Sequence, residues 1–325
     1  MWHISKQPLI ILAPMDGYTD SAFRQMVKTI EPRTIVFTEF ISARDLSRSG
    51  SLADKLLSHD AIEHPLVVQL YGKSPSDFTE SAKIAEQHGA CGVDINMGCP
   101  AKKVVAHSHG SALMKDIGLA CEIIRQIKQS VSVPVTVKTR LGWEHHNDLI
   151  PFIAQLEEVG LDAVTVHGRT YSQKFQGEAN WDPIYALKKE LRIPVIGNGD
   201  ITNGVKAKSK LKNLDGVMVG RAATSNPWLL KEIASTILDS DEKTFERALL
   251  SEQAPHWMTY VEKTALVMAE RSACQRFRRI LISLIKDNGI SPQLRQLAIK
   301  VESLKDIQSV FDLFIADIED KPRVI

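Results

Sequence analysis

The chain has 325 residues, of which 44% are hydrophobic and 24% charged, a composition that argues against a disordered protein and allows a sizeable buried core. Its 40 basic and 39 acidic residues nearly cancel, so a nucleic-acid partner would have to be met by a local basic patch. No apolar run approaches the ~20 residues of a membrane helix, the stretch Leu9–Leu12 is a poor signal peptide, and four cysteines without CxxC pairing favour the cytoplasm.

Short runs rich in Val, Ile and Leu alternate with helix-like segments along the first two thirds of the chain. The runs predict β-strands at Leu9–Met15, Thr34–Phe40, Leu66–Gly72, Gly92–Gly98, Val133–Gly142, Ala163–Gly168, Pro194–Gly199 and Gly216–Gly220. Predicted helices between them include Ser74–His88, Ile117–Ser130, Leu149–Val159 and Trp181–Leu191. Eight such units in about 225 residues predict an α/β fold, a closed (β/α)8 TIM barrel. A doubly wound open sheet is the alternative, but it more often has about five or six strands.

Beyond Arg221 the β-like runs stop, and from Ala248 onward apolar residues recur at helical spacing. The polar stretch Asp239–Phe245 is predicted to be a linker. We therefore expect two domains, a barrel over residues 1–238 and an all-helical bundle over residues 248–325.

Polar residues stand at the ends of the predicted strands, where barrel enzymes carry their chemistry. Strand alternation turns Lys138 and Arg140 inward, and two inward cations are costly to desolvate unless an anion meets them. The anion is either an internal partner, Glu39 or Asp94, or a ligand bound at the barrel mouth. Similar alternation turns four more polar side chains inward, those of Gln69, Asn96, His167 and Asn198.

Phosphate is the leading candidate for that ligand. The glycine-bearing segments Gly197–Asp200 and Val219–Arg221 close the last two predicted strands, where such barrels commonly bind phosphate through backbone N–H groups. A phosphorylated cofactor such as FMN would meet this requirement, with Lys138 near its pyrimidine ring.

Cys99 lies on a turn that leaves the fourth predicted strand, between Gly98 and Pro100. A lone cysteine is more often a small buried hydrophobic residue than a catalyst, and the other three cysteines fit that interpretation. Near Lys138 and Arg140, however, Cys99 is placed to act as a nucleophile or as a general acid.

Together these segments resemble the tRNA-dihydrouridine synthases, flavin enzymes with a barrel and a C-terminal helical domain. The matching motifs run in family order over Ala13–Asp20, Thr38–Glu39, Val68–Gly72, Asp94–Val104, Gly110–Met114, Val137–Trp143, Val166–Thr170, Asn198–Ile201 and Gly220–Arg221. The sequence of the segment Asn96–Val104 is most similar to that of the bacterial B-type branch of the family.

The resemblance implies a role for each matching residue. FMN contacts are implied for Pro14, Met15, Asp16, Gln69, Lys138, His167, Asn198, Gly199, Asp200, Gly220 and Arg221. Cys99 matches the proton donor, Asn96 and Arg140 match positions that orient the target uracil, and Arg169 is expected to reach the RNA backbone. The implied reaction is reduction of the C5–C6 double bond of D-loop uridines in tRNA, with NADPH as reductant and NADH left open.

A basic stretch in the last third supports an RNA partner. Residues 271–300 carry seven basic side chains, among which Arg276, Arg278 and Arg279 are expected to grip tRNA; a solvated helix face is the alternative. The chain also departs from the family in this region, because Ile280 and Leu284–Ile285 replace its histidine and aromatic residues. In Val105–His109, expected to be an active-site loop, two histidines replace the usual basic residues.

Two other functions remain open from the sequence. One is a barrel flavoprotein that reduces a small metabolite, similar to a dihydroorotate dehydrogenase, although that function does not explain the basic helical domain. The other is an RNA-binding protein with a structural flavin, against which the intact Cys99, Lys138 and His167 argue. We expect a cytoplasmic monomer without a metal and without a membrane partner.

Overall fold

The computed structural model describes residues 7–100, 110–239, 245, 248–287 and 292–319. Contacts divide the chain into two units. One comprises Met1–Gly220 with Leu229–Lys243, and the other comprises Arg221–Trp228 with Thr244–Ile325. The short segment Arg221–Trp228 thus groups with the C-terminal unit although it directly follows the last strand of the first unit.

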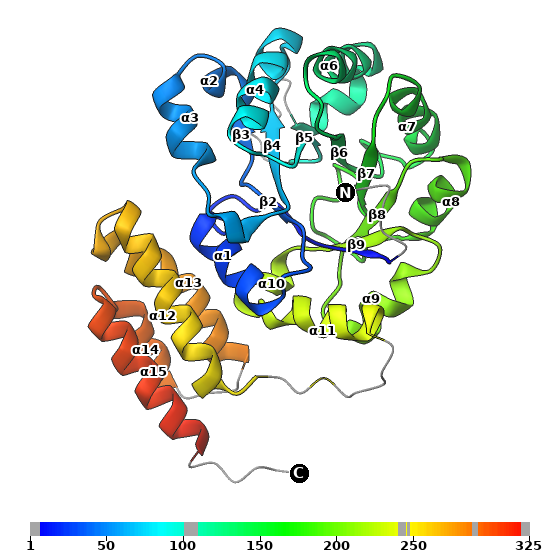
Figure 1. Cartoon of the computed structure of the whole chain (residues 1–325). Helices are drawn as coiled ribbons and strands as arrows, with labels where there is room; N and C mark the ends of the chain where they lie inside the picture. The colour runs from blue at the N-terminus through cyan, green and yellow to red at the C-terminus, as the bar shows by residue number, and fades with distance from the viewer. Residues whose placement is uncertain (1–6, 101–109, 240–244, 246–247, 288–291, 320–325) are drawn as a thin grey trace. The chain divides into compact units, whose positions relative to one another are not determined.

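The first unit is a parallel barrel, as predicted (Figure 1). Its strands follow one another in the order β1-β9-β8-β7-β6-β5-β4-β2, and a bridge between Ile11 and Ile35 brings the two ends of this order together. Backbone hydrogen bonds from Leu12 N to Ile35 O and from Ile35 N to Ile10 O, each 2.9 Å long, support the bridge. This nearly closed ring rules out the open doubly wound sheet.

The strands are shorter than predicted, although some residues beyond their ends still bond to a neighbouring strand, such as Ala13 N to Val219 O at 2.8 Å. They are β1 (Leu9–Leu12), β2 (Val36–Phe37), β4 (Leu66–Tyr71), β5 (Gly92–Met97), β6 (Val135–Arg140), β7 (Ala163–His167), β8 (Val195–Asn198) and β9 (Gly216–Val219). An unpredicted two-residue strand, β3 (Ile41–Ser42), pairs with the end of β4.

Helices cover the outside of the ring (Figure 1). They are α1 (Ser21–Ile30), α2 (Ala43–Leu46), α3 (Gly50–Leu57), α4 (Pro75–Gln87), α6 (Ile117–Ser130), α7 (Leu149–Glu158), α8 (Asp182–Glu190), α9 (Gly204–Leu211) and α11 (Trp228–Leu238), with short 3-10 turns η1 (Ala61–Glu63) and η2 (Gly110–Lys115). Sequence-local capping starts several of them: the side chains of Asp20, Ser74 and Asn203 accept backbone N–H groups of α1, α4 and α9.

The barrel interior changes from apolar to polar along the strands, and this change positions the site. A buried apolar cluster includes Phe37, Val67 and Ile196. Because successive side chains alternate, the residues two positions further along the same strands point to the same side, and these include Gln69 and Asn198. The polar layer therefore rests on an apolar floor at the carboxyl ends of the strands.

The second unit is helical. It contains α10 (Arg221–Ser225), α12 (Leu250–Val267), α13 (Glu270–Asp287), α14 (Pro292–Lys300) and α15 (Leu304–Glu319). Its core is aromatic: the Trp257 ring lies 5.7 Å from that of Phe277, which lies 6.3 Å from Phe311. Among the helices that the structure describes in either unit, none is long and apolar enough to cross a membrane.

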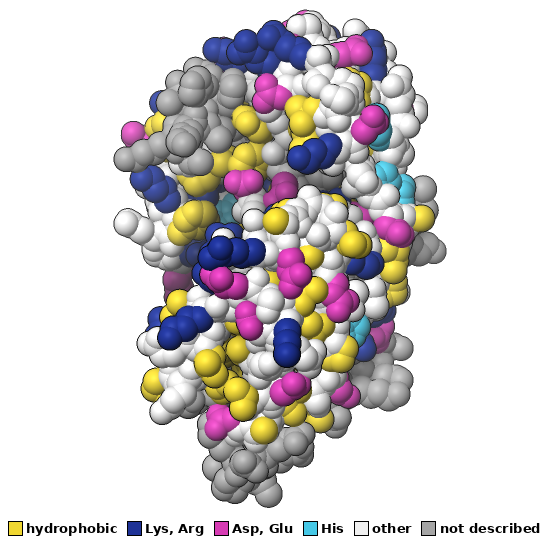
Figure 2. All heavy atoms as spheres, turned by 90° about the vertical axis from the view of Figure 1, so that its left-hand side faces the viewer, with side chains coloured by type: hydrophobic (Ala, Val, Ile, Leu, Met, Phe, Trp, Pro, Cys, Tyr) yellow, Lys and Arg dark blue, Asp and Glu magenta, His cyan; other side chains and the backbone are white. Residues whose placement is uncertain are grey.

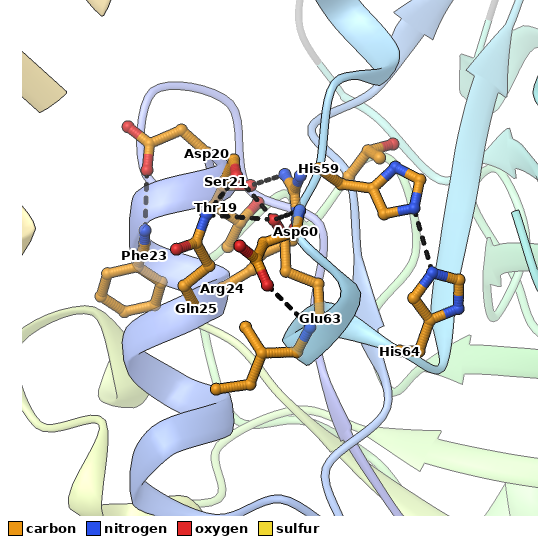
Figure 3. A network of polar contacts seen from close by, with 12 residues as sticks. Thr19, Asp20, Ser21, Phe23, Arg24, Gln25, His59, Asp60, Glu63 and His64 are labelled. Atoms are coloured by element: carbon orange, nitrogen blue, oxygen red, sulfur yellow. Dashed lines mark hydrogen bonds and ion pairs between the residues drawn. The ribbon is translucent and has the colours of Figure 1, made fainter. Parts of the chain in front are cut away.

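A buried ion pair fastens α1 to the turn before β4 (Figure 3). Arg24 Nε donates to Glu63 Oε2 at 2.6 Å, and the other Glu63 oxygen accepts from the Ser21 hydroxyl and the Asp60 backbone N–H. The side chains of Arg24 and Glu63 are 5% and 0% exposed, so neither charge can return to water without unfolding.

Replacing Glu63 should therefore leave a buried guanidinium without its counter-charge. We expect Glu63→Gln to lower the free energy of unfolding by about 3–5 kcal/mol, measured by urea denaturation followed by circular dichroism. The matched control is Glu122→Gln, which breaks the half-exposed pair with Arg125 and should cost less than about 1 kcal/mol. Equal losses in both variants would contradict this account.

Candidate active site

The register of the central strands brings the predicted polar residues to one end of the barrel. Asn96 lies opposite Lys138, and His167 lies opposite both Arg140 and Asn198. Two residues earlier on β5 than Asn96, Asp94 lies opposite both Gln69 and Thr136. All of these side chains except that of Lys138 are less than 9% exposed.

A chain of hydrogen bonds links Asp94 to the turn that carries Cys99. The two Asp94 oxygens accept from Thr136 Oγ1 at 2.6 Å and from Gln69 Nε2 at 2.7 Å. Gln69 Oε1 accepts from Asn96 Nδ2 at 2.9 Å. Asn96 Oδ1 then accepts from the backbone N–H groups of Gly98 and Cys99, at 3.1 and 2.9 Å. The turn is thus fixed from inside the barrel.

Lys138 is the cation of the site. Its Nζ donates to Asn198 Oδ1 at 3.3 Å, and Asn198 Nδ2 donates in turn to the Met218 carbonyl at 2.7 Å. Burial, reinforced by the nearby charge of Arg140, lowers the pKa of Lys138 to about 8, against the opposing charge of Asp94. An anion bound near Nζ would restore the stability of the protonated form.

Arg140 ties the Cys99 turn to the loop after β7. Its Nε donates to the Gly98 carbonyl at 2.8 Å, and its Nη1 donates to the carbonyls of Thr170 and Lys174 at 3.1 and 2.8 Å. The sequence showed only that Arg140 points inward. It did not show this bridging role, because the acceptors are backbone atoms of a loop. Contact with uracil stays a prediction.

Arg169 and Asp200 form a second tie between loops. Arg169 Nη2 lies 2.9 and 2.7 Å from the two Asp200 oxygens, and it also donates to the Gly177 carbonyl. The Ala179 N–H donates to the same carboxylate at 2.7 Å. The Arg169 side chain is 3% exposed, and its buried Nη1 has no hydrogen-bond partner among the residues described. Its contact with RNA, like that of Asp200 with the cofactor, remains a prediction.

The segment after β1 supplies the opposite wall. Met15 N donates to Thr19 Oγ1 at 2.9 Å, and this turn leaves Pro14 and Met15 half-buried while Asp16 is exposed. A Cβ added to Gly220, directly after β9, would meet only ordinary contacts at 3.6 Å with Ala13 and the Met15 sulfur. Gly220 thus lies close to both Ala13 and Met15.

Gly199 serves a different purpose from Gly220. Its φ is +129°, and a Cβ there would lie 2.7 Å from the Ala179 Cβ, so close packing of two loops requires glycine. The adjacent Asp200 also has a positive φ, of 54°. The sequence pointed to phosphate binding for both, and the structure adds this packing reason.

Two further residues at the site were not predicted. Thr136 holds Asp94, and Ser111 Oγ donates to the Cys99 carbonyl at 2.9 Å. Strand alternation alone would have placed Thr136 on the inner face with Lys138, two residues on. The segment Ala101–His109, which includes the expected active-site loop, lies outside the described residues.

The three arginines predicted to grip RNA lie on α13 and differ in their surroundings. Arg278 donates from Nε and Nη2 to the Val301 carbonyl at 2.9 and 2.8 Å, so it helps to hold the bundle together. Arg276 is half-buried and Arg279 is exposed. Figure 2 shows a face on which basic and acidic side chains are interspersed. The small net charge of +1 is thus matched by mixed charge on that face.

Comparison with known proteins decides the family. A family model described as dihydrouridine synthase matches residues 11–318. The chain belongs to the dihydrouridine synthase family. As a member of this family it is an oxidoreductase of the flavin-dependent kind, as predicted.

Similar proteins extend this finding. A probable tRNA-dihydrouridine synthase of Rickettsia bellii is 44% identical over 240 residues, 72% of this chain and 73% of the relative. A tRNA-dihydrouridine synthase B of Pasteurella multocida is 34% identical over 321 residues, 97% of this chain and 96% of the relative. The predicted similarity to the B-type branch is therefore confirmed.

A solved structure supports the fold alone. Histamine dehydrogenase from Rhizobium sp. 4-9 superposes with a TM-score of 0.53 and 14% sequence identity, over 70% of this chain and 45% of that one. The match covers much of the chain in spite of the low identity, as expected when parallel barrels share an architecture without sharing a sequence.

The buried carboxylate of Asp94 should weaken the fold. Burial raises the pKa of Asp94 to about 6, well above the ~3.9 of an unfolded chain. The penalty is absent below the unfolded pKa, grows as the pH rises toward 6, and is complete above it. Asp94→Asn should therefore melt at a higher temperature than the wild type at pH 7.5, with a gap that narrows toward pH 4.5. Calorimetry at both pH values measures this, and a gap that widens at low pH would contradict it.

Proposed function

We propose that the chain is an FMN-dependent tRNA-dihydrouridine synthase that reduces the C5–C6 double bond of D-loop uridines with NADPH. The observation that carries the proposal is the fixed Cys99 turn beside the buried Arg140 and the half-buried Lys138, in a chain that matches the family over residues 11–318. The relatives named as tRNA-dihydrouridine synthases support tRNA as the substrate. Since that substrate is cytoplasmic, we propose the same location for the enzyme.

The residues present fit a flavin. Lys138 supplies a half-buried cation for the pyrimidine ring of the flavin. Arg169, whose buried Nη1 is a donor without a hydrogen-bond partner in the described part of the chain, is proposed to reach the RNA backbone. Gly220, which follows β9 beside Met15, is proposed as a backbone contact of the flavin. The remaining contacts proposed for FMN are those of Pro14, Met15, Asp16, Gln69, His167, Asn198, Gly199, Asp200 and Arg221.

Bound FMN would supply the hydride for uracil C6, and the protein would supply the proton for C5 from Cys99. A cysteine thiol suits this task because its unperturbed pKa of about 8.5 leaves it protonated at neutral pH. Asn96 uses one Nδ2 hydrogen on Gln69. The second is left for a carbonyl oxygen of the uracil, which accepts but does not donate. Reaching Cys99 requires the uridine to leave its stack.

Removing the thiol should separate the two halves of the reaction. We expect Cys99→Ala to bind FMN and to be reduced by NADPH as the wild type is. Flavin reoxidation by unmodified tRNA transcript should slow by about 10²–10⁴-fold, because the general acid is lost. Anaerobic stopped-flow absorbance measures both steps. Cys121→Ala is the matched control, because Cys121 lies on α6, on the outside of the ring, where its Sγ donates to the Gln155 carbonyl at 3.7 Å.

Other outcomes distinguish the alternative functions. Wild-type reoxidation that ignores RNA would favour the enzyme that reduces a small metabolite. A flavin that neither NADPH nor tRNA turns over, in a protein that still binds tRNA, would favour a structural flavin. A protein that cannot be reconstituted with flavin would exclude the proposed chemistry.

The helical unit is proposed to bind tRNA through α13. The exposed Arg279 and the half-buried Arg276 lie three residues apart, on one face of the helix. We expect Arg276→Ala/Arg279→Ala to weaken tRNA binding and to reduce the slope of log K against log salt by roughly 1–2, since each phosphate contact contributes about 0.7–0.9. Filter binding at salt concentrations between about 50 and 200 mM measures this slope.

The control removes charge elsewhere in the same unit. Lys305 is exposed on α15 and lies outside the basic stretch. Lys305→Ala should leave the salt slope unchanged. Equal effects of both variants would indicate general attraction between charges instead of a binding face on α13.

A further inference from the structure

The turn that carries Cys99 depends on which end of the Asn96 amide faces it. Asn96 Oδ1 accepts from the N–H groups of Gly98 and Cys99. Turned by 180°, the amide would set its NH2 group against these two donors, and both backbone N–H groups would lose their acceptor. The turn is therefore stable in one amide orientation and not in the other.

Gln69 decides that orientation, and it is itself an amide. Its Oε1 accepts from Asn96 Nδ2, while its Nε2 donates to Asp94 Oδ2. If both amides turned together, the contact between them would survive, because each amide has one donor end and one acceptor end. The pair of amides alone therefore does not select between the two orientations.

Asp94 removes this ambiguity. An ionised carboxylate can only accept, so Gln69 must present Nε2 to it. Asp94 is fully buried, and its other oxygen is occupied by the hydroxyl of Thr136. The charged group that acts on Asp94 is Lys138, on the neighbouring strand β6. The pKa of Asp94, at about 6, leaves the carboxylate ionised at neutral pH.

We propose that Asp94 is a positioning residue for Cys99: its acceptor-only carboxylate orients Gln69 and then Asn96, so that Asn96 Oδ1 holds the Cys99 turn. The catalytic significance of this arrangement rests on the proposed role of Cys99 as proton donor. The arrangement itself concerns only hydrogen bonds within the barrel. Asp94 thus acts on the Cys99 turn through two intermediate side chains, those of Gln69 and Asn96.

Exchanging the two side chains tests the direction of the chain. In Asn96→Asp, a carboxylate faces Gln69 Oε1, so Gln69 can satisfy residue 96 or residue 94 but not both. In Asn96→Asp/Asp94→Asn, all contacts are satisfied again with Gln69 reversed. Asn at 94 donates to Gln69 and accepts from Thr136, Gln69 donates to Asp at 96, and that carboxylate accepts from the turn.

The readout is hydrogen exchange at the Gly98 and Cys99 amides, followed by mass spectrometry at pH 7.5 on the full chain. Asn96→Asp should speed exchange at least about tenfold, and the double variant should return it to within about threefold of the wild type. Asp94→Asn alone, which permits both orientations, should also speed exchange. The matched control, Thr136→Val, leaves the Asp94 carboxylate facing Gln69 and should exchange like the wild type.

If the effects of the two substitutions add, the amides of the double variant will exchange faster than those of either single variant. That result would overturn the proposal. Should Asn96→Asp fail to fold, Gln69→Met cuts the link instead. Asp94→Asn should then have no further effect in that background, and an undiminished effect would overturn the proposal equally.

Turnover separates this proposal from the proposed function. Asp94→Asn should slow tRNA-driven flavin reoxidation, measured in protein whose flavin NADPH has already reduced. The exchange rates could follow the expected pattern while the wild-type protein fails to reduce tRNA. That outcome would contradict the proposed function but would still support the positioning role of Asp94.

Discussion

The site depends on two opposite charges kept inside a closed barrel. Asp94 and Lys138 lie on adjacent strands. Burial raises the pKa of Asp94 and lowers that of Lys138, so it favours the neutral form of each group. Their attraction offsets only part of the lost solvation. What remains is a carboxylate with two donors and an ammonium that hydrogen-bonds one amide and still favours an anionic ligand. The rest of the polar layer is arranged around these two needs.

Backbone carbonyls complete the arrangement. Arg140 binds three of them, and Met218 O determines which end of Asn198 faces Lys138. A carbonyl cannot donate, so the contact with Met218 O admits only one orientation of the Asn198 amide, while the three carbonyls around Arg140 fix the position of its guanidinium. The barrel thus limits the conformations of the site before any ligand arrives, which lowers the entropic cost of binding.

The sequence predicted the barrel because its period and strand count are properties of the whole chain. It also predicted which side chains point inward, since strand alternation depends on local spacing alone. It did not predict β3, the bridging role of Arg140, or the pairing of Arg169 with Asp200. Each of these depends on where a loop folds back, and loops carry no periodic pattern. Family resemblance supplied chemical roles for the site residues, but not the hydrogen bonds among them.

The ring closes through a single bridge between β1 and β2, supported by two backbone hydrogen bonds at Ile35, while neighbouring pairs such as β5 and β6 share five residue pairs in register. This bridge, called the seam below, is the junction with the fewest paired residues among the described strands. In the strand order, β6 and β7 lie on the opposite side of the ring from the seam. Local opening of the wall would therefore begin at the seam, where the fewest ladder bonds must break. Strand β6, which carries Lys138, and strand β5, which the Cys99 turn follows, would stay paired during such openings, so the polar layer of the site would keep its arrangement.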